Sequence, residues 1–332
     1  AIGSALATLQ DPDRRIVAIG VSNQRETALL WDRKTGRPVG PAVVWQCRRS
    51  GAICEALRAA GHELRVQART GLQLDPMFSA GKFRWLLDQA AEDDAQPSSG
   101  ELCAGNVDAW LLWNLTGGID KRAVHATDAT NGSRTQLMAL DTLSWDHELL
   151  DIFGIDRAIL PVVRPSSAIF GRTATIDLPG GDRLPAGIPI AAMIGDSHAS
   201  LFGLGGFRPG AVKATYGTGT SLMTPTTDIV ASKHGLSTTV AWSRRPPHPG
   251  SSPSPDTAPP MPGNTIYALE GNIYTTGGAV RYVGELLGLE DPVAGVDALA
   301  RSVKDAGDVV FVPALVGLGA PHWQDTAQGS IS

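Results

Sequence analysis

The stretch M-I-G-D-S-H-A-S-L-F-G (Met193–Gly203) sets a single carboxylate, Asp196, between two uncharged segments. The uncharged residues 188–194 predict a buried strand, and the small residues after Asp196 predict a helix that begins at this point. Aspartate often caps the first turn of a helix. At the end of a strand it can also act as a general base that faces a ligand crevice. Position alone leaves both roles of Asp196 open.

Outward from this junction, the sequence divides into two α/β halves. Before it we predict strands at 15–22, 27–31 and 42–45, with 27–31 as the partner of 15–22, and helices at 79–90, 106–115 and 142–153. After it we predict strands at 211–216, 236–242, 266–270 and 309–314 and a helix at 278–288. We therefore expect an α/β protein with a mixed sheet, divided into domains of residues 1–190 and 191–332. A small-molecule site is expected in the crevice between them, where Asp196 lies.

Three further local features can be read from the sequence. The first ten residues resemble the end of a helix. Ser79 is a good N-cap for the predicted helix at 79–90. Residues 244–263 are rich in proline and serine and predict a mobile surface loop, because they cannot bury a core.

The composition excludes several classes of protein. With 42% hydrophobic and 18% charged residues in a chain of 332, the protein is globular and not disordered. A net charge of -5 argues against nucleic acid or an acidic membrane as the main partner. No uncharged run reaches the roughly 18 residues of a membrane-spanning helix, and no secretory signal begins the chain. Three cysteines without C-x-x-C spacing indicate free thiols in a reducing cytoplasm. A homo-oligomer is left open.

Polar groups follow the predicted strand 15–22 in the segment S-N-Q-R-E (22–26). Strand ends in α/β sheets commonly point side chains into a ligand crevice. Arg25 offers a planar fork of donors and Glu26 accepts them, which suits a polyhydroxylated ligand. A surface ion pair is the more ordinary interpretation of these two residues. Trp45 could wall a sugar pocket, or it could fill the core.

Glycines at two places could bring the backbone close to a phosphate. The segment Y-G-T-G-T-S (216–221) predicts a hairpin turn whose Gly217, Thr218 and Gly219 could donate to one. Gly277 opens a helix whose N-terminus could bind one. For each glycine, close packing is the alternative. The sequence contains no P-loop. It also lacks the H-E-x-x-H motif of metal sites, the serine elbow of hydrolases and a dinucleotide fingerprint after a strand. No metal site, hydrolase triad or dinucleotide site is therefore predicted.

Taken in order, these segments resemble the FGGY family of carbohydrate kinases, and within it the glycerol kinase branch. The resemblance covers nearly the whole chain. It rests on the segments I-G-V-S-N-Q-R-E-T-A-L-L-W-D-R-K-T-G-R-P (19–38), V-V-W-Q-C-R-R (43–49), M-F-S-A-G-K-F-R-W-L-L-D-Q (77–89), G-N-V-D-A-W-L-L-W-N-L-T-G-G (105–118), T-D-A-T-N-G-S-R-T (127–135), G-D-S-H-A-S-L-F-G (195–203), Y-G-T-G-T-S (216–221), Y-A-L-E-G (267–271) and P-A-L-V-G-L-G-A-P-H-W (313–323).

The resemblance implies a ribonuclease H-like fold of the actin and hexokinase type. Residues 1–190 would form the substrate-side domain and 191–332 the nucleotide-side domain. ATP would phosphorylate a primary hydroxyl of a polyol or sugar, with Mg²⁺ bridging the phosphates. Asp196 matches the catalytic base, and its uncharged flanks would leave it in low-charge surroundings that make it a better proton acceptor.

The remaining site residues are also carried over from the resemblance. Those that would bind the substrate are Arg25 and Glu26 by hydrogen bonds, Trp45 by packing on its carbons, and Met77 and Ser197 at pocket positions. Those that would lie near the nucleotide are Gly217, Thr218, Gly219, Gly277 and Arg281.

Several residues depart from the glycerol kinase pattern. That branch has tyrosine where this chain has Met77, glutamine at Ser197, phenylalanine at Ser221, usually aspartate at Cys47, and glutamine at Arg281. Replacing two aromatic rings by methionine and serine removes bulk and a hydroxyl donor. We therefore expect a substrate other than glycerol, such as a longer polyol or a ketose, with a tetritol or xylulose as examples.

The ends of the chain also depart from the family. The sequence starts after the family's D-x-G-T phosphate motif and stops before its adenosine-binding part, which predicts an incomplete chain that is a poor kinase or none. The alternative is a non-catalytic kinase-fold fragment that binds a sugar or a partner. A nicotinamide dehydrogenase is disfavoured, because no dinucleotide fingerprint follows a strand.

Overall fold

The computed structural model describes residues 16–92, 101–119, 123–178, 183–244 and 264–332. The chain forms two compact units: unit 1 comprises Ala1–Ala199 and Thr239–Tyr267, and unit 2 comprises Ser200–Thr238 and Ala268–Ser332. The predicted helix end at the N-terminus, and the predicted loop 244–263 apart from its first residue, lie outside the described residues.

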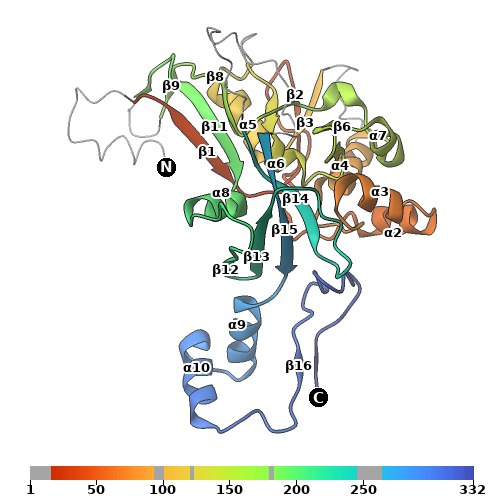
Figure 1. Ribbon diagram of the computed structural model, residues 1–332, viewed down its shortest axis with the longest axis vertical. Helices are drawn as coiled ribbons and strands as arrows, with labels where there is room; N and C mark the ends of the chain where they lie inside the picture. The colour runs from red at the N-terminus through yellow and green to blue at the C-terminus, as the bar shows by residue number, and fades with distance from the viewer. Residues whose placement is uncertain (1–15, 93–100, 120–122, 179–182, 245–263) are drawn as a thin grey trace. The chain divides into compact units, whose positions relative to one another are not determined.

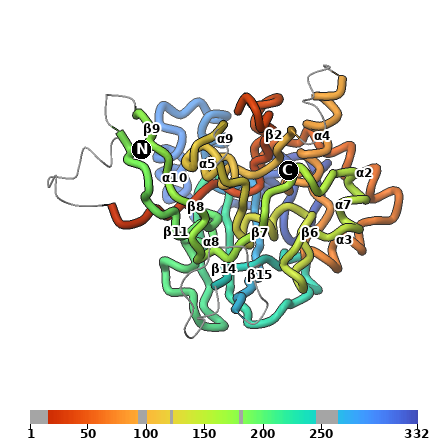
Figure 2. Tube along the Cα trace, turned by 90° about the horizontal axis from the view of Figure 1, so that it is seen from above, coloured from red at the N-terminus to blue at the C-terminus, as the bar shows by residue number. Residues whose placement is uncertain are grey.

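The central sheet of unit 1 brings together two strands from opposite ends of its sequence. Strand β1 (Ile19–Asn23) pairs in parallel with β11 (Pro189–Gly195), and β11 pairs antiparallel with β8 (Ser167–Arg172), so the sheet is mixed as predicted. Asn23 lies opposite Gly195, so β1 and β11 end at the same edge (Figure 1). Figure 2 shows β8 and β11 side by side from above. Helix α8 (Asp196–Gly203) begins directly after β11, which confirms the predicted strand-to-helix junction.

The predicted partner of the first strand is wrong. Residues 27–31 were expected to pair with 15–22, but β2 (Leu29–Asp32) pairs antiparallel with β3 (Leu102–Gly105). The physical reason lies in the segment between the strands, where Glu26 has a positive φ of 57° that takes the chain out of the first sheet. The predicted strand 42–45 is reduced to a single bridge between Ala28 and Val43.

Two predicted helices of unit 1 are confirmed and a third is shorter than expected. Helices α4 (Ser79–Glu92) and α5 (Val107–Leu115) match the patterns at 79–90 and 106–115. Ser79 is the first helical residue, and its hydroxyl donates to the carbonyl of Glu26. Residues predicted to open a helix at 142 instead form a hairpin, and α7 (His147–Phe153) begins only after Asp146, whose carboxylate caps it by accepting from the N–H of Leu149.

The other described elements of unit 1 were not predicted from the sequence. They are the helices α2 (Gly51–Ala59), α3 (Glu63–Thr70) and α6 (Ala129–Gly132), the 3-10 helix η1 (Arg157–Ile159), and the strands β4 (Ala126–Asp128), β5 (Met138–Ala139), β6 (Ser144–Trp145), β7 (Val162–Arg164), β9 (Ile176–Asp177) and β10 (Arg183–Leu184). They are short, and β4–β7, β5–β6 and β9–β10 form separate two-stranded ladders.

The core of unit 1 includes two large clusters of buried apolar side chains. One large cluster packs helix α4 and α7 side chains such as Phe83, Leu86 and Phe153 against β2. A second cluster packs Leu112 and Phe170 against β1 and β11. The second cluster also contains Val21, Ile190 and Met193, so it packs β1 and β11 together.

Unit 2 is built around the predicted hairpin. Strands β12 (Lys213–Tyr216) and β13 (Thr220–Thr226) pair antiparallel with Tyr216 opposite Thr220. They belong to a sheet ordered β12-β13-β15-β14, whose strands β14 (Ser237–Ser243) and β15 (Thr265–Ile273) confirm the predictions at 236–242 and 266–270. Strand β14 from Thr239 onward and β15 up to Tyr267 are counted in unit 1. Helix α9 (Gly277–Leu286) confirms the prediction at 278–288 and is followed by α10 (Pro292–Ser302). The strand predicted at 309–314 is only β16 (Phe311–Val312), paired with β17 (Ser330–Ile331).

None of the described helices has the length and hydrophobicity that crossing a lipid bilayer demands.

Candidate functional site

Asp196 lies at the shared edge of β1 and β11. Asp196 is the first residue of α8, and its side chain is 56% exposed. Its Oδ1 accepts a hydrogen bond of 2.7 Å from the N–H of Ser197. A carboxylate at this position also lies at the positive end of the helix dipole. The predicted helix-opening role of Asp196 is therefore compatible with an accessible carboxylate.

A buried arginine in the segment that follows β1 approaches Asp196. The Nε of Arg25 lies 3.3 Å from Asp196 Oδ1 and 3.9 Å from Glu26 Oε1, so one guanidinium lies between two carboxylates. Gly195 makes this approach feasible, because an added Cβ would meet Arg25 Cγ and Cδ at 2.7 Å. The expectation that Asp196 has low-charge surroundings is wrong. Its neighbours in the sequence are uncharged, but the fold places Arg25, which is far away in the sequence, next to its carboxylate.

The two oxygens of Asp196 have different environments. Both the Ser197 N–H and the Arg25 guanidinium contact Oδ1. Within the described residues, no hydrogen bond or ion pair uses Oδ2. One oxygen is thus held in place while the other can accept a proton or a hydrogen bond from a ligand.

Glu26 is held more firmly than Asp196. Its side chain is buried, and its Oε1 accepts a 2.6 Å hydrogen bond from Nε of Arg134. Sequence analysis did not assign Arg134 a role. A signal for it was present, because Arg134 is the only charged residue between Asp128 and Asp141.

The ends of β1 and β11 are both tied to α6. The side-chain amides of Asn23 and Asn131 exchange two hydrogen bonds, of 2.9 and 3.1 Å. The N–H of Gly195 donates to the hydroxyl of Thr130. Asp128 caps α6 by accepting from the N–H groups of Thr130 and Asn131, and burial raises the pKa of its carboxyl. This network fixes the edge from which Arg25 and Asp196 project.

Three further predicted substrate residues belong to unit 1. Trp45 is half-buried in the turn that follows Val43. Met77 is buried, and its N–H donates to Asp75 Oδ1 at 2.7 Å. Ser197 is half-buried beside Asp196. Of the predicted substrate residues, the structure thus brings Arg25, Glu26 and Asp196 into direct contact.

The predicted phosphate residues belong to unit 2 and form one compact turn. The N–H of Gly277 donates to the carbonyl of Gly217, and the N–H groups of Thr276 and Gly278 donate to the carbonyl of Thr218. The first N–H groups of α9 are therefore used by the hairpin turn. A phosphate here would need other donors, such as the exposed Thr218. Arg281 lies exposed about one turn further along α9.

The two glycines that meet in this turn should respond differently to alanine. A Cβ on Gly277 would lie 2.6 Å from the carbonyl oxygen of Gly217, whereas a Cβ on Gly217 meets nothing closer than 3.6 Å. We expect Gly277→Ala to lower the free energy of unfolding by about 1–3 kcal/mol and Gly217→Ala to change it by less than about 0.5 kcal/mol. Urea unfolding of both variants measures this, and an equal loss in both would contradict it.

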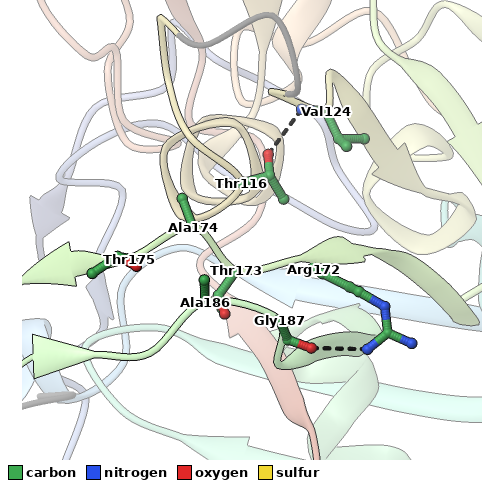
Figure 3. A pocket seen from close by; sticks show the side chains of 8 residues that line it. All are labelled: Thr116, Val124, Arg172, Thr173, Ala174, Thr175, Ala186 and Gly187. Carbon is green, nitrogen blue, oxygen red and sulfur yellow. Dashed lines mark hydrogen bonds between the residues drawn. The ribbon is translucent and has the colours of Figure 1, made fainter.

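A pocket elsewhere in unit 1 contains none of the predicted site residues. It has a volume of about 640 Å³ and is lined by Thr116, Val124, Arg172, Thr173, Ala174, Thr175, Ala186 and Gly187 (Figure 3). Its main polar side chains are already used: Arg172 donates to the carbonyl of Gly187, and the Thr116 hydroxyl accepts from the N–H of Val124 (Figure 3). The edge of β1 and β11 is the better candidate site.

The described residues contain no group of three or more histidine, cysteine, aspartate or glutamate side chains that could hold a metal ion. Mg²⁺ in phosphoryl transfer is usually held by one or two carboxylates and by the phosphates themselves. The carboxylates of the candidate site are compatible with a Mg²⁺ ion whose ligands come mainly from the phosphates.

Known proteins similar to this chain share one family. Residues 1–203 match the N-terminal domain of the FGGY family of carbohydrate kinases, and residues 212–332 match its C-terminal domain. The chain is 48% identical over 317 residues to glycerol kinase of Thermus brockianus, covering 95% of this chain, and 46% identical over 318 residues to that of Nitrosomonas eutropha, covering 96%. It spans 58% of the length of each of these relatives.

Solved structures agree with this result. The chain is similar to Plasmodium falciparum glycerol kinase with ADP, with a TM-score of 0.79 and 32% identity over 100% of this chain and 61% of that one. It shares its fold with xylulose kinase of Lactobacillus acidophilus, at a TM-score of 0.71 and 22% identity over 96% of this chain and 59% of that one. These similarities confirm the predicted ribonuclease H-like α/β fold. By sequence and by structure, the chain belongs to the FGGY family of carbohydrate kinases.

Proposed function

We propose that this chain supplies the substrate site and the general base of an ATP-dependent kinase that phosphorylates a primary hydroxyl of a polyol or sugar. The single observation that carries the proposal is the pair of environments at Asp196: Oδ1 is anchored by Ser197 and Arg25, and Oδ2 is available on an exposed carboxylate. Family membership supports the same activity.

The proposed reaction needs one proton acceptor and one set of positioning groups. Asp196 Oδ2 takes the proton of the substrate hydroxyl as its oxygen attacks the γ-phosphorus of ATP. A new oxygen–phosphorus bond forms, and the bond from the γ-phosphorus to the oxygen of the leaving ADP breaks. Arg25 donates to substrate hydroxyls and Glu26 accepts from them, while Trp45 packs on the carbon chain.

The nucleotide side of the proposal rests on unit 2. Gly217, Thr218, Gly219 and Gly277 would lie near the phosphates of ATP, with Arg281 near the nucleotide. Mg²⁺ would arrive with the phosphates and offset their charge. We propose that the predicted residues 1–190 form the substrate side and 191–332 the nucleotide side.

We further propose a substrate larger than glycerol. Ser221 stands at a predicted pocket position, and its hydroxyl donates to Glu270 Oε1 at 2.9 Å, so this position offers polar groups instead of an aromatic ring. Met77 and Ser197 change two other predicted pocket positions. A tetritol, a pentitol or a ketopentose such as xylulose offers additional hydroxyl groups for such a pocket.

The test is a panel of substrates with the 332-residue chain. Binding is measured by calorimetry for glycerol, a tetritol, a pentitol and a ketopentose, and transfer is measured with γ-labelled ATP. We expect at least one longer substrate to bind about tenfold or more tightly than glycerol, the size of discrimination that pocket contacts supply. A clear preference for glycerol would rule out the larger substrate.

The same panel separates the kinase from its alternative. A non-catalytic fragment would bind a polyol and transfer no phosphate. If none of the panel compounds binds, the proposed substrate site is wrong. The predicted cytoplasmic location and the oligomeric state stay predictions.

A further inference from the structure

Two buried cations in unit 1 have no part in the reaction proposed above. Lys82 in α4 and Arg134, which follows α6, are both 0% exposed. Burying a cation is costly unless it is hydrogen-bonded, so each should have a structural or functional reason to be there. Both contact the same two places: residue 26 and the segment Met77–Phe78.

Lys82 joins these two places through the backbone. Its Nζ donates to the carbonyl of Glu26 at 3.1 Å and also to the carbonyl of Met77. No ion pair among the described residues involves Lys82. Burial lowers the pKa of its amine to about 7.

Arg134 joins the same two places through side chains. Its Nε donates to Glu26 Oε1 at 2.6 Å, and its guanidinium lies 4.9 Å from the centre of the Phe78 ring. Residue 26 is therefore held at its carbonyl by one cation and at its carboxylate by the other. The adjoining Thr27 is held as well, because Asn106 donates to its carbonyl at 2.9 Å and to the hydroxyl of Ser79.

The backbone of Glu26 explains why two such contacts are needed. Its φ of 57° is in the left-handed region, which a residue with a long side chain rarely adopts. Such a conformation persists only when the surrounding structure over-determines it, and it is most often found at ligand sites. Without its buried partners, this segment would relax and move Arg25 and Glu26.

We infer that Lys82 and Arg134 are positioning residues that clamp residue 26 to the Met77–Phe78 segment and so fix the width of the polyol site. This inference takes the identity of the ligand, a polyol, from the proposed function. The clamp itself exists in the protein without ligand. Neither cation touches the substrate in this arrangement. They act through Glu26 and Met77.

The test compares Lys82→Met with a matched core variant of the same helix, Leu86→Ala. Leu86 is buried in the main cluster of unit 1 and belongs to none of the contacts above. Hydrogen exchange of the free protein reports the clamp through the amides of Thr27 and Met77. We expect Lys82→Met to speed their exchange about tenfold or more relative to Leu86→Ala when both variants have similar Tm.

Polyol binding then reports the consequence for the site. We expect Lys82→Met to weaken binding of the best panel member about 10- to 100-fold in the folded protein, as misplaced positioning groups do. Leu86→Ala should keep the affinity of the wild type. Should Lys82→Met fail to fold, Arg134→Lys keeps a charge but shortens the side chain and so weakens its contact with Glu26. The same two measurements then apply.

The outcomes separate the clamp from the proposed function. Equal exchange and equal polyol affinity in Lys82→Met and Leu86→Ala would overturn the inference, as would a loss of affinity without faster exchange. Faster exchange in a chain whose wild type binds no polyol would support the clamp and refute the proposed ligand.

Discussion

Replacing Asp196 with asparagine is expected to slow phosphoryl transfer about 10²–10⁴-fold, the usual contribution of a general base. Asparagine keeps an oxygen that can accept from the N–H of Ser197 and from Arg25, so the local geometry should survive. Its amide nitrogen, which takes the place of Oδ2, is a donor with no lone pair available to take a proton. The variant therefore removes the acceptor that Oδ2 provides and little else.

Polyol binding should change far less than the rate. The carboxylate of Asp196 is 56% exposed, so its ion pair with Arg25 contributes at most about 1 kcal/mol. We expect the dissociation constant of the best panel member to rise by less than about fivefold, which corresponds to that energy. A large change in rate with a small change in affinity is the pattern of a group that acts mainly in the transition state.

The measurement is transfer from γ-labelled ATP with the protein in excess, which detects slow transfer. Asp177→Asn is the matched control, because Asp177 is also exposed and paired with an arginine, Arg183, away from the candidate site. The control should keep the rate of the wild type. A rate in Asp196→Asn within about threefold of the control would remove Asp196 from the role of base, since a true base contributes far more.

The junction that carries Asp196 could be predicted because its causes are local. An uncharged run followed by an acid and small residues predicts a strand and then a helix, and β11 and α8 have those bounds. The same is true of α4 and α5, whose apolar spacing is helical. Hydrophobic periodicity predicts secondary structure that is decided within one segment, and these elements are of that kind.

The partner of β1 could not be predicted, because pairing is not local. The strand at 27–31 lies nearest in sequence, but β1 pairs with β11 far along the chain. The hydrophobic patterns of the two candidate partners are both compatible with pairing. The deciding feature is the left-handed backbone of Glu26, which no propensity assigns to a glutamate.

The charges around the site illustrate the same limit. The sequence near Asp196 is uncharged, which predicts low-charge surroundings, but Arg25 contacts it from the segment after β1. The resemblance to known kinases named Arg25, Glu26 and Asp196 as site residues without showing what holds them. The buried partners Lys82 and Arg134 become visible only when separate segments are brought together.

A buried carboxyl in α5 should make the stability of the protein fall as the pH rises toward neutrality. Asp108 is 0% exposed, and its Oδ2 accepts a 2.6 Å hydrogen bond from the hydroxyl of Thr127. Its Oδ1 has no hydrogen-bond partner among the described residues. Burial, together with the nearby Asp128, raises the pKa of Asp108 to about 7.

The direction of the effect follows from a comparison of the two states: the folded chain binds the Asp108 proton more tightly than the unfolded chain does. The folded chain holds the Asp108 proton up to about pH 7, whereas the unfolded chain releases it near the ordinary aspartate pKa of 3.8. The stabilisation is fully present below pH 4 and is lost as the pH rises through about 7. A shift of about three units corresponds to a loss of up to about 4 kcal/mol.

Asp108→Asn should remove this pH dependence, because asparagine does not titrate. Urea unfolding at several values between pH 5 and pH 8 measures the free energy of unfolding of both proteins. We expect the variant to be less stable than or equal to the wild type at pH 5 and more stable by about 2–4 kcal/mol at pH 8. Asp177→Asn, at an exposed position, should show no such trend.

Comparing the two proteins matters because other groups titrate in the same window. Burial lowers the pKa of His125 to about 4, so its contribution to stability rises with pH where that of Asp108 falls. The contribution of His125 is common to wild type and variant and cancels in their difference, provided that the two sites are independent. A difference between Asp108→Asn and wild type that stays constant from pH 5 to pH 8 would show that the buried carboxyl does not control stability in this range.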